Sequence, residues 1–429
     1  MKTNKLFWRR LDNSAKIFPM STGKKYSTVF RLSVVLKKEI KPEILQEALI
    51  KTLEKYKSFR VRMKAGLFWY YLEQNTKEPI IEEEKDYPCK YINPKQTNNY
   101  LFKVTYFKNK VNIDIFHSLT DGNSGTIFFR EIIYTYLELC NQVELNQENR
   151  QVRKIEHNIE DSYMKNYDKK AKSCVSAKRA YELKGRKIKL GAISAIHQII
   201  DLEQLKEESK KHGATITQYL TAVLMYTIYK ENYIKNKGRK PIKICIPVNL
   251  KRYFPSKTMS NFFSYITVAM EMKNNKLESF EKIVQVVKQE FEHSLKKEEI
   301  IKTMSGNVRL GNNFFIKSIP LFLKNIIVRL SYLEIRKHAT ITYSNIGRIG
   351  IIGEYQKYIN YFLMLIAPDQ VEKIKCSSCT FENKIVFTFT SILNDNNIEK
   401  SFYNFLINKG INVQIESNGV LDDISAKIK

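Results

Sequence analysis

The chain has 429 residues, of which 43% are hydrophobic and 12% aromatic, and its formal net charge is +28. This length exceeds one comfortable hydrophobic core and predicts two lobes, 1–175 and 176–429, while the aromatic content argues against disorder. No stretch longer than 18 residues lacks Asp, Glu, Lys and Arg, and the N-terminus has no apolar run before a cleavage site. We therefore expect no membrane span, no signal peptide and a cytoplasmic location.

The basic charge has two interpretations. A balance this strong indicates an anionic partner, such as nucleic acid, a membrane surface, the phosphate tail of CoA or an acidic carrier protein. Alternatively, Lys, Asn and Ile are used heavily throughout, as a low-GC genome dictates, and the lysines are spread over the whole chain. Composition alone leaves these alternatives open.

The first lobe is predicted to mix strands and helices. Aromatic residues, charges and an Asp-Asn pair crowd residues 7–19, which predicts an ordered loop anchored by Trp8 and Phe18. Apolar alternation and apolar stripes of helical period predict a strand at 28–36, a helix opening at Pro42, hairpin sequence at 59–71 and 101–116, and a helix over 129–140.

The most informative stretch runs from the last of these strands into the helix. Val111, Ile113 and Ile115 alternate with polar residues, and the strand pattern breaks at His117. A turn follows at Asp121-Gly122. His117 is thus expected at a strand end, where a fold can hold an imidazole rigidly and still leave it reachable. Alone, these residues also fit a loop histidine beside a turn-forming Asp-Gly pair.

After a polar crossover at 141–189, the second lobe repeats the order of strand, helix and strand. The same patterns predict strands at 196–200 and 242–248, a helix from Leu202, a second helix capped by Thr215 or Thr217, a helix over 280–291, a C-terminal hairpin at 364–391 and a last helix at 402–407.

A basic apolar stretch, 314–335, is broken by Pro320 and carries Lys317, Lys324 and Arg329. It predicts either peripheral contact with a membrane surface or a long acyl chain, or a pair of core helices with snorkelling cations. The six cysteines show no framework spacing, and a single C-x-x-C at 376–379 is at most half a zinc site. We expect structural cysteines and no metal.

The spacing His117-x-x-x-Asp121-Gly122 resembles the active-site motif of the CoA-dependent acyltransferase superfamily. That superfamily includes chloramphenicol acetyltransferase, BAHD acyltransferases, alcohol acetyltransferases and peptide-synthetase condensation domains. Further segments resemble it in the correct order, closest to the bacterial alcohol acetyltransferase branch: 6–20, 245–266 and 340–391. The resemblance implies an α/β fold with mixed sheets, in which two chloramphenicol-acetyltransferase-like lobes enclose the active site in a tunnel and the first lobe carries the motif.

The resemblance also implies the chemistry. His117 would be the general base that deprotonates a hydroxyl as it attacks an acyl thioester, an effect worth about 10²–10⁴ in rate. Asp121 would point away from the substrate and pair with Arg252 to hold the loop, and Gly122 would allow the tight turn. By location only, five residues are candidates for contacting substrate or oxyanion: Asn261, Ser264, Tyr265, Thr342 and Ser344.

The expected reaction moves an acyl group from acyl-CoA, or from an acyl-carrier protein, to a small alcohol or amine, with no bound cofactor. Condensation domains usually carry a second histidine before the motif histidine, and Phe116 stands there in this sequence. This favours an O-acyltransferase over the alternative, a condensation-type enzyme acting on carrier-bound substrates. A third hypothesis, a nucleic-acid-binding module, requires a contiguous basic face with aromatics. We expect no nucleic-acid partner.

Overall fold

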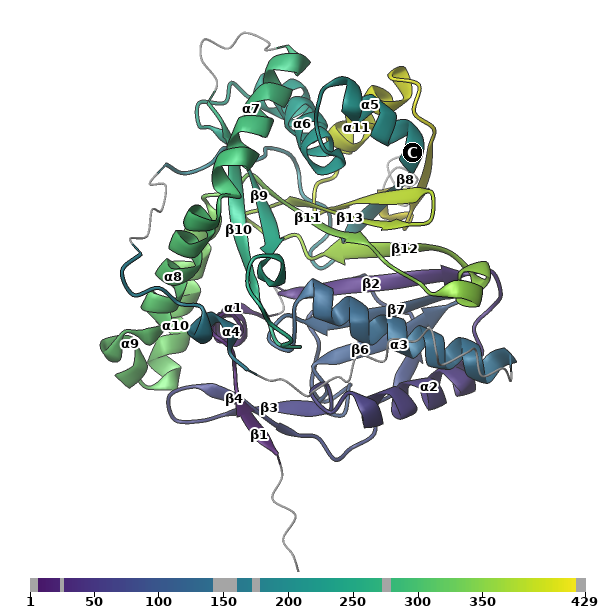
Figure 1. Cartoon of the computed structure of the whole chain (residues 1–429), viewed down its shortest axis with the longest axis vertical. Helices are drawn as coiled ribbons and strands as arrows, with labels where there is room; N and C mark the ends of the chain where they lie inside the picture. Colours follow the sequence, from purple (N-terminus) through teal and green to yellow (C-terminus); the bar gives the residue numbers. More distant parts are fainter. Residues whose placement is uncertain (1–6, 24–26, 142–159, 172–177, 272–278, 422–429) are drawn as a thin grey trace, which may run out of the picture.

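The computed structural model describes residues 7–23, 27–141, 160–171, 178–271 and 279–421 (Figure 1). The predicted boundary between 175 and 176, and much of the predicted crossover, lie outside these residues. The described chain forms a mixed α/β fold with two large sheets and one small sheet. The expected fold class is therefore confirmed.

The first large sheet has five strands in the order β12-β2-β7-β6-β5. Its strands are β2 (Val29–Leu36), β5 (Ile81–Glu83), β6 (Phe102–Phe107), β7 (Lys110–Phe116) and β12 (Ile359–Ile366). Helices α2 (Pro42–Lys55) and α3 (Gly122–Asn141) lie side by side against this sheet (Figure 1). The predicted strand at 28–36, the hairpin at 101–116 and the helix opening at Pro42 are confirmed.

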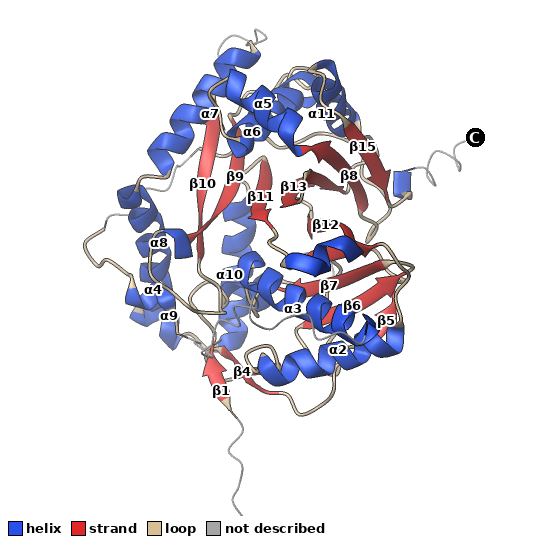
Figure 2. Cartoon of the chain, turned by 45° about the vertical axis from the view of Figure 1, so that its right-hand side comes forward, coloured by secondary structure: helices blue, strands red, loops and turns tan. Residues whose placement is uncertain are grey.

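The second large sheet has seven strands in the order β10-β9-β11-β13-β14-β8-β15. They are β8 (Ser194–Asp201), β9 (Ile242–Asn249), β10 (Phe263–Met270), β11 (Ile341–Arg348), β13 (Ile374–Phe381), β14 (Lys384–Ser391) and β15 (Val413–Ser417). Four helices gather on its outer side (Figure 2): α5 (Leu202–Lys211), α6 (Ile216–Ile228), α7 (Phe280–Ser294) and α11 (Asn397–Asn408). Thr215 begins α6 in a capping box with Gln218, which confirms one of the two predicted caps.

Strand β12 ties the two halves of the chain together. It comes from the second half, yet it pairs antiparallel with β2 of the first sheet. Its other face packs on the second sheet, where Leu363 and Leu365 join Ile199 and Val386 in one apolar cluster. The predicted lobes are thus not independent in sequence, because the second half supplies an edge strand to the first sheet.

The remaining helices form a third body along one side (Figure 1). It consists of α1 (Ile17–Ser21), α4 (Ser162–Lys165), α8 (Lys297–Asn312), α9 (Phe314–Ser318) and α10 (Leu321–Arg336), with the short helices η2 (Tyr229–Tyr233), η3 (Leu250–Arg252) and η4 (Gly353–Tyr358) lying elsewhere. Below it lies the small sheet of β1 (Trp8–Arg10), β4 (Tyr70–Gln74) and β3 (Val61–Ala65). No helix within the described ranges combines the length and apolarity needed to cross a bilayer.

Candidate active site

His117 lies directly after β7, as the strand pattern predicts, and its backbone N–H donates to the Thr28 carbonyl at 3.1 Å. Its half-buried ring packs among three aromatic rings. It stacks on Phe18 of α1 with centroids 4.6 Å apart, and it lies 5.2 Å from both Phe30 of β2 and Phe263 of β10. Rings from both halves of the chain therefore fix the plane of the imidazole.

Asn261 fixes the protonation pattern of that ring. The Asn261 Nδ2 amide donates to the His117 carbonyl at 3.0 Å and to Asp12 Oδ2 at 3.1 Å. Both partners are acceptors, so the amide oxygen must face His117 Nδ1, from which it lies 2.9 Å away. An amide oxygen only accepts, so Nδ1 carries the proton. Nε2 of the neutral ring is then unprotonated and able to act as a base.

Asp12 anchors Asn261 from behind. Its Oδ2 accepts from both the backbone and the side-chain amide of Asn261 at 3.1 Å, and its Oδ1 accepts from the backbone N–H of Ala15 at 2.8 Å. Asp12 is 5% exposed and Asn261 is completely buried. The result is a relay from a buried carboxylate through an amide to the imidazole.

Burial also sets the electrostatics of this relay. Desolvation lowers the pKa of His117 below 6.5, although the charge of Asp121 and the hydrogen bond to Asn261 oppose it. Desolvation raises the pKa of Asp12 to about 6, against the opposing hydrogen bonds from Ala15 and Asn261. Near pH 7 the imidazole is therefore neutral and Asp12 is mostly ionised.

Asp121 begins α3 and binds the second half of the chain. Its Oδ1 accepts from the backbone N–H of Ser124 at 2.9 Å, and its Oδ2 accepts from that of Phe262 at 2.9 Å. The predicted ion pair with Arg252 is wrong: Arg252 is exposed, and among the described residues no ion pair joins it to Asp121. The neighbouring Lys251 points toward α3 instead and donates to Ser124 Oγ at 2.8 Å.

With this geometry in place, the comparison with protein families is decisive. The sequence model described as alcohol acetyltransferase matches residues 91–358, which is more than half of the chain and includes His117, Asp121 and Asn261. The chain belongs to the alcohol acetyltransferase family. Membership confirms the predicted superfamily and the expectation of an O-acyltransferase enzyme. A search of curated protein sequences finds no match.

Solved structures agree with this alcohol acetyltransferase at the level of fold. TRI101 from Fusarium graminearum, complexed with coenzyme A and deoxynivalenol, is 11% identical with a TM-score of 0.63, covering 92% of this chain and 96% of its own. The TRI3 trichothecene 15-O-acetyltransferase from Fusarium sporotrichioides is 8% identical with a TM-score of 0.62, covering 95% and 97%. The starter condensation domain of rhizomide synthetase RzmA, complexed with C8-CoA, is 11% identical with a TM-score of 0.61, covering 93% and 94%.

Two other sequence-predicted roles need correction in this alcohol acetyltransferase. Gly122 is the first residue of α3, and its backbone is not in the left-handed region. A Cβ there would make ordinary contacts with Ile346 at 3.4 Å and Met364 at 3.6 Å, so the turn does not require glycine. Asn261 was expected to contact substrate or oxyanion, but its amide is engaged by Asp12 and His117.

The other four candidates lie on β10 and β11. The Ser264 hydroxyl is buried and has no hydrogen-bond partner, but strand alternation directs it to the face opposite Phe263, and so away from His117. Tyr265 shares the face of Phe263. Thr342 donates to Glu372 Oε2 at 2.6 Å, which occupies its hydroxyl. Ser344 lies on the same face of β11 as Ile346, whose side chain reaches the start of α3.

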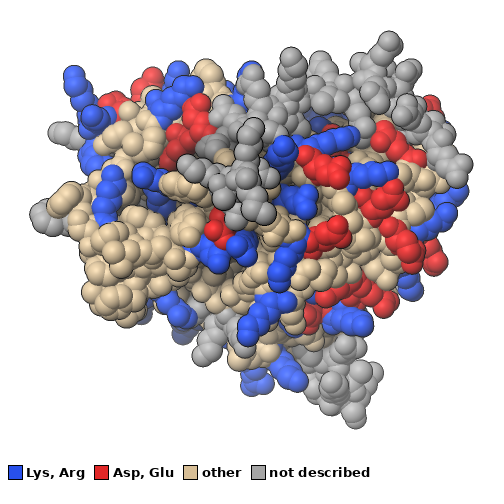
Figure 3. All heavy atoms as spheres, turned by 90° about the horizontal axis from the view of Figure 1, so that it is seen from below, with Lys and Arg blue, Asp and Glu red and all other residues tan. Residues whose placement is uncertain are grey.

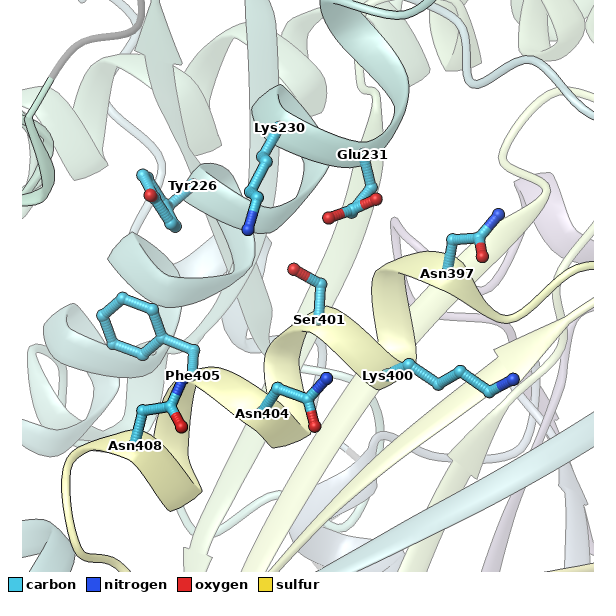
Figure 4. A pocket seen from close by; sticks show the side chains of 9 residues that line it. All are labelled: Tyr226, Lys230, Glu231, Asn397, Lys400, Ser401, Asn404, Phe405 and Asn408. Carbon is cyan, nitrogen blue, oxygen red and sulfur yellow. The ribbon is translucent and has the colours of Figure 1, made fainter.

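A surface hollow lies remote from this site. It has a volume of about 350 Å³ and opens between α6, η2 and α11 (Figure 4). In that view the Ser401 hydroxyl points toward Lys230 and Glu231, and polar side chains form most of the wall. None of its lining residues is a predicted site residue, so it contributes nothing to the chemistry of His117.

Sequence reasoning missed Asp12 as a functional residue. The only signal was the Asp-Asn pair in the crowded segment 7–19, and nothing local connected it to Asn261. The predicted structural cysteines fit what is described: Cys376 and Cys379 are free and buried in β13. Within the described ranges, no group of three or more His, Cys, Asp or Glu side chains is arranged to hold a metal ion.

Proposed function

We propose that the protein transfers an acyl group from an acyl-CoA thioester to the hydroxyl of a small alcohol, with His117 as general base. The observation that carries this proposal is the hydrogen bond from His117 Nδ1 to Asn261 Oδ1 at 2.9 Å. It leaves the Nε2 lone pair for the proton of an incoming hydroxyl. Family membership supports the reaction class, and CoA or C8-CoA in the TRI101 and RzmA complexes supports the donor.

The proposed reaction is a direct transfer. Nε2 of His117 takes the hydroxyl proton as the oxygen forms a bond to the thioester carbonyl carbon. The tetrahedral intermediate collapses by breaking the carbon–sulfur bond, and the departing CoA sulfur receives the proton from the imidazolium. No acyl-enzyme is needed because the thioester is already activated, and a well-placed base supplies about 10²–10⁴ in rate.

The other motif residues have positioning roles in this proposal. Asn261 and Asp12 hold the ring through Nδ1 and stabilise the imidazolium as it forms, because the negative carboxylate lies one amide away. Asp121 fastens the histidine loop to residue 262 and takes no part in proton transfer. Ser344 and Tyr265 remain the candidates for contacting the oxyanion, and a tunnel between the two halves of the chain would deliver the substrates to His117.

A screen for acyl transfer tests the proposal. Acyl-CoA donors of increasing chain length are mixed with alcohol or amine acceptors, and mass spectrometry follows the ester, the amide and free CoA. His117→Ala should lower acceptor-dependent CoA release by about 10²–10⁴. His293→Ala, which replaces an exposed histidine on α7, is the matched control and should leave the rate unchanged.

A second donor separates the two enzyme classes. An acyl group on the phosphopantetheine arm of a carrier protein is offered in place of acyl-CoA. Transfer from CoA to alcohols supports the proposed O-acyltransferase. Transfer from the carrier alone, with binding that weakens as salt is added, would support the condensation-type alternative instead.

A further inference from the structure

Helix α10 buries a basic side chain and exposes large apolar ones, which is the reverse of the usual pattern on a surface helix. Lys324 faces inward and is 1% exposed, with its ammonium 3.6 Å from the centroid of the Trp69 ring and 2.9 Å from the Phe68 carbonyl. Phe322 is 67% exposed and Leu330 is 64% exposed. Burying a cation is costly, and so is leaving large apolar side chains in water. This pattern is therefore unfavourable if the outer face of α10 contacts only solvent.

Eight exposed apolar residues lie on three neighbouring segments: the β3–β4 hairpin, α9 and α10. On α10 they recur at helical spacing, and the tip of the β3–β4 hairpin lies beside the start of α10, since the Leu321 N–H donates to the Leu67 carbonyl at 2.9 Å. We define the α10 stripe as Leu67, Phe68, Phe314, Phe322, Leu323, Ile326, Ile327 and Leu330. An exposed cluster of this kind marks an interaction surface.

The charged residues within the segment that carries α9 and most of α10 are all basic. Residues 300–333 contain no Asp or Glu but include exposed Lys317 and Arg329. Seen from below, a broad tan area covers the side where α9 and α10 lie, with blue and fewer red side chains near its margin (Figure 3). Elsewhere on that face blue and red side chains are interspersed.

We propose that the α10 stripe docks the protein on the surface of an anionic lipid bilayer. The aliphatic and Phe side chains would enter the boundary between headgroups and acyl chains, and the cations would lie at the level of the phosphates. A second copy of the chain is a poorer occupant because it would bring like charges together. An acidic protein would match the cations. Its charged side chains would find no partner in the stripe, whose eight members are all apolar.

The stripe also lies close to the candidate active site. α10 packs against α1, and Phe18 of α1 stacks on the His117 ring. A bilayer seated on the stripe would therefore be separated from His117 by α10 itself and the short helix α1.

Vesicle flotation of the full chain tests the proposal. The protein should float with vesicles of phosphatidylcholine and phosphatidylglycerol, and less with phosphatidylcholine alone. The variant Phe322→Ser/Ile326→Ser/Leu330→Ser should bind the anionic vesicles at least about tenfold more weakly. The matched control makes the same number of exposed apolar-to-serine changes on the other lobe, Leu190→Ser/Ile407→Ser/Ile415→Ser, and should bind like the wild type.

A charge variant and a size measurement complete the test. Lys317→Gln/Arg329→Gln should weaken binding to anionic vesicles but not to neutral ones, and thermal melts should show that every variant remains folded. Absence of vesicle binding by the wild type, or equal loss in the control variant, would overturn the proposal. So would light scattering that shows a dimer dissociated by the stripe variant, or an acidic carrier protein bound in place of lipid.

Discussion

The amide oxygen of Asn261 lies 2.9 Å from Nδ1 of His117, and the two residues are separated by 144 positions in the sequence. The contact joins the end of β7 in the first sheet to the segment before β10 in the second. The candidate base therefore has the correct tautomer only when the two halves of the chain are assembled. Its reactivity and the packing of the halves become linked properties.

Replacing Asn261 with alanine should impair the base without removing it. The imidazole would lose the acceptor that holds Nδ1–H, and both tautomers would become populated. We expect kcat/KM to fall by about tenfold to a hundredfold. In the His117→Ala background the same change should cost little more, because the two residues act as a unit. Equal losses in both backgrounds would indicate a purely structural role for Asn261.

The pH dependence of the rate follows from the lowered pKa of His117. Desolvation favours the neutral ring, so the base becomes protonated only below its usual pKa of 6.5. We expect kcat/KM to fall on acidification with a midpoint below 6.5. A profile measured across this range checks the expectation. A midpoint above 7 would contradict it.

Asp12 should make stability depend on pH. Its pKa is raised by burial from 3.8 to about 6, so the folded state binds the proton more tightly than the unfolded state does. Its contribution is fully present below pH 3.8 and is lost as pH rises through about 6, a change of about 3 kcal/mol. Urea unfolding of wild type and Asp12→Asn at pH 4.5 and 7 measures it. The wild type should lose more stability than the variant on going to pH 7, and identical differences would refute this assignment.

Asp121 and Arg252 should differ sharply in their effects on stability. Asp121→Ala removes acceptors for the backbone N–H groups of Ser124 and Phe262, so we expect a loss of about 2–4 kcal/mol in the free energy of unfolding. Arg252→Ala changes an exposed side chain and should stay within about 0.5 kcal/mol of wild type. Denaturant unfolding of both variants tests this. Equal destabilisation by the two variants would instead support the ion pair between Asp121 and Arg252 that the sequence suggested.

The sequence predicted what local patterns encode. The alternation of apolar and polar residues predicted that β7 ends just before His117. Pro42 and Thr215 predicted the starts of α2 and α6, because proline favours the first helical turn and threonine caps a helix N-terminus. It could not reveal that β12 joins the first sheet, because pairing with β2 depends on contacts across more than 300 residues. The Asp12 relay was hidden for the same reason.

Arg252 shows a subtler limit of sequence reasoning. A basic pair at 251–252 could be predicted near the motif, but the turn of η3 decides which member points toward α3. Side-chain direction in a three-residue helix shifts by about 120° per residue. The turn of η3 therefore directs Lys251 toward α3, and not the predicted Arg252.

The central claim concerns which nitrogen of one imidazole carries the proton. Nitrogen-15 spectra of the histidine-labelled protein, with His117→Ala used to assign the signal, distinguish a protonated from an unprotonated ring nitrogen near pH 7.5. We predict an unprotonated Nε2 and a protonated Nδ1, and a mixture of both tautomers after Asn261→Ala. A proton on Nε2 in the wild type would contradict the proposed role of His117 as the base.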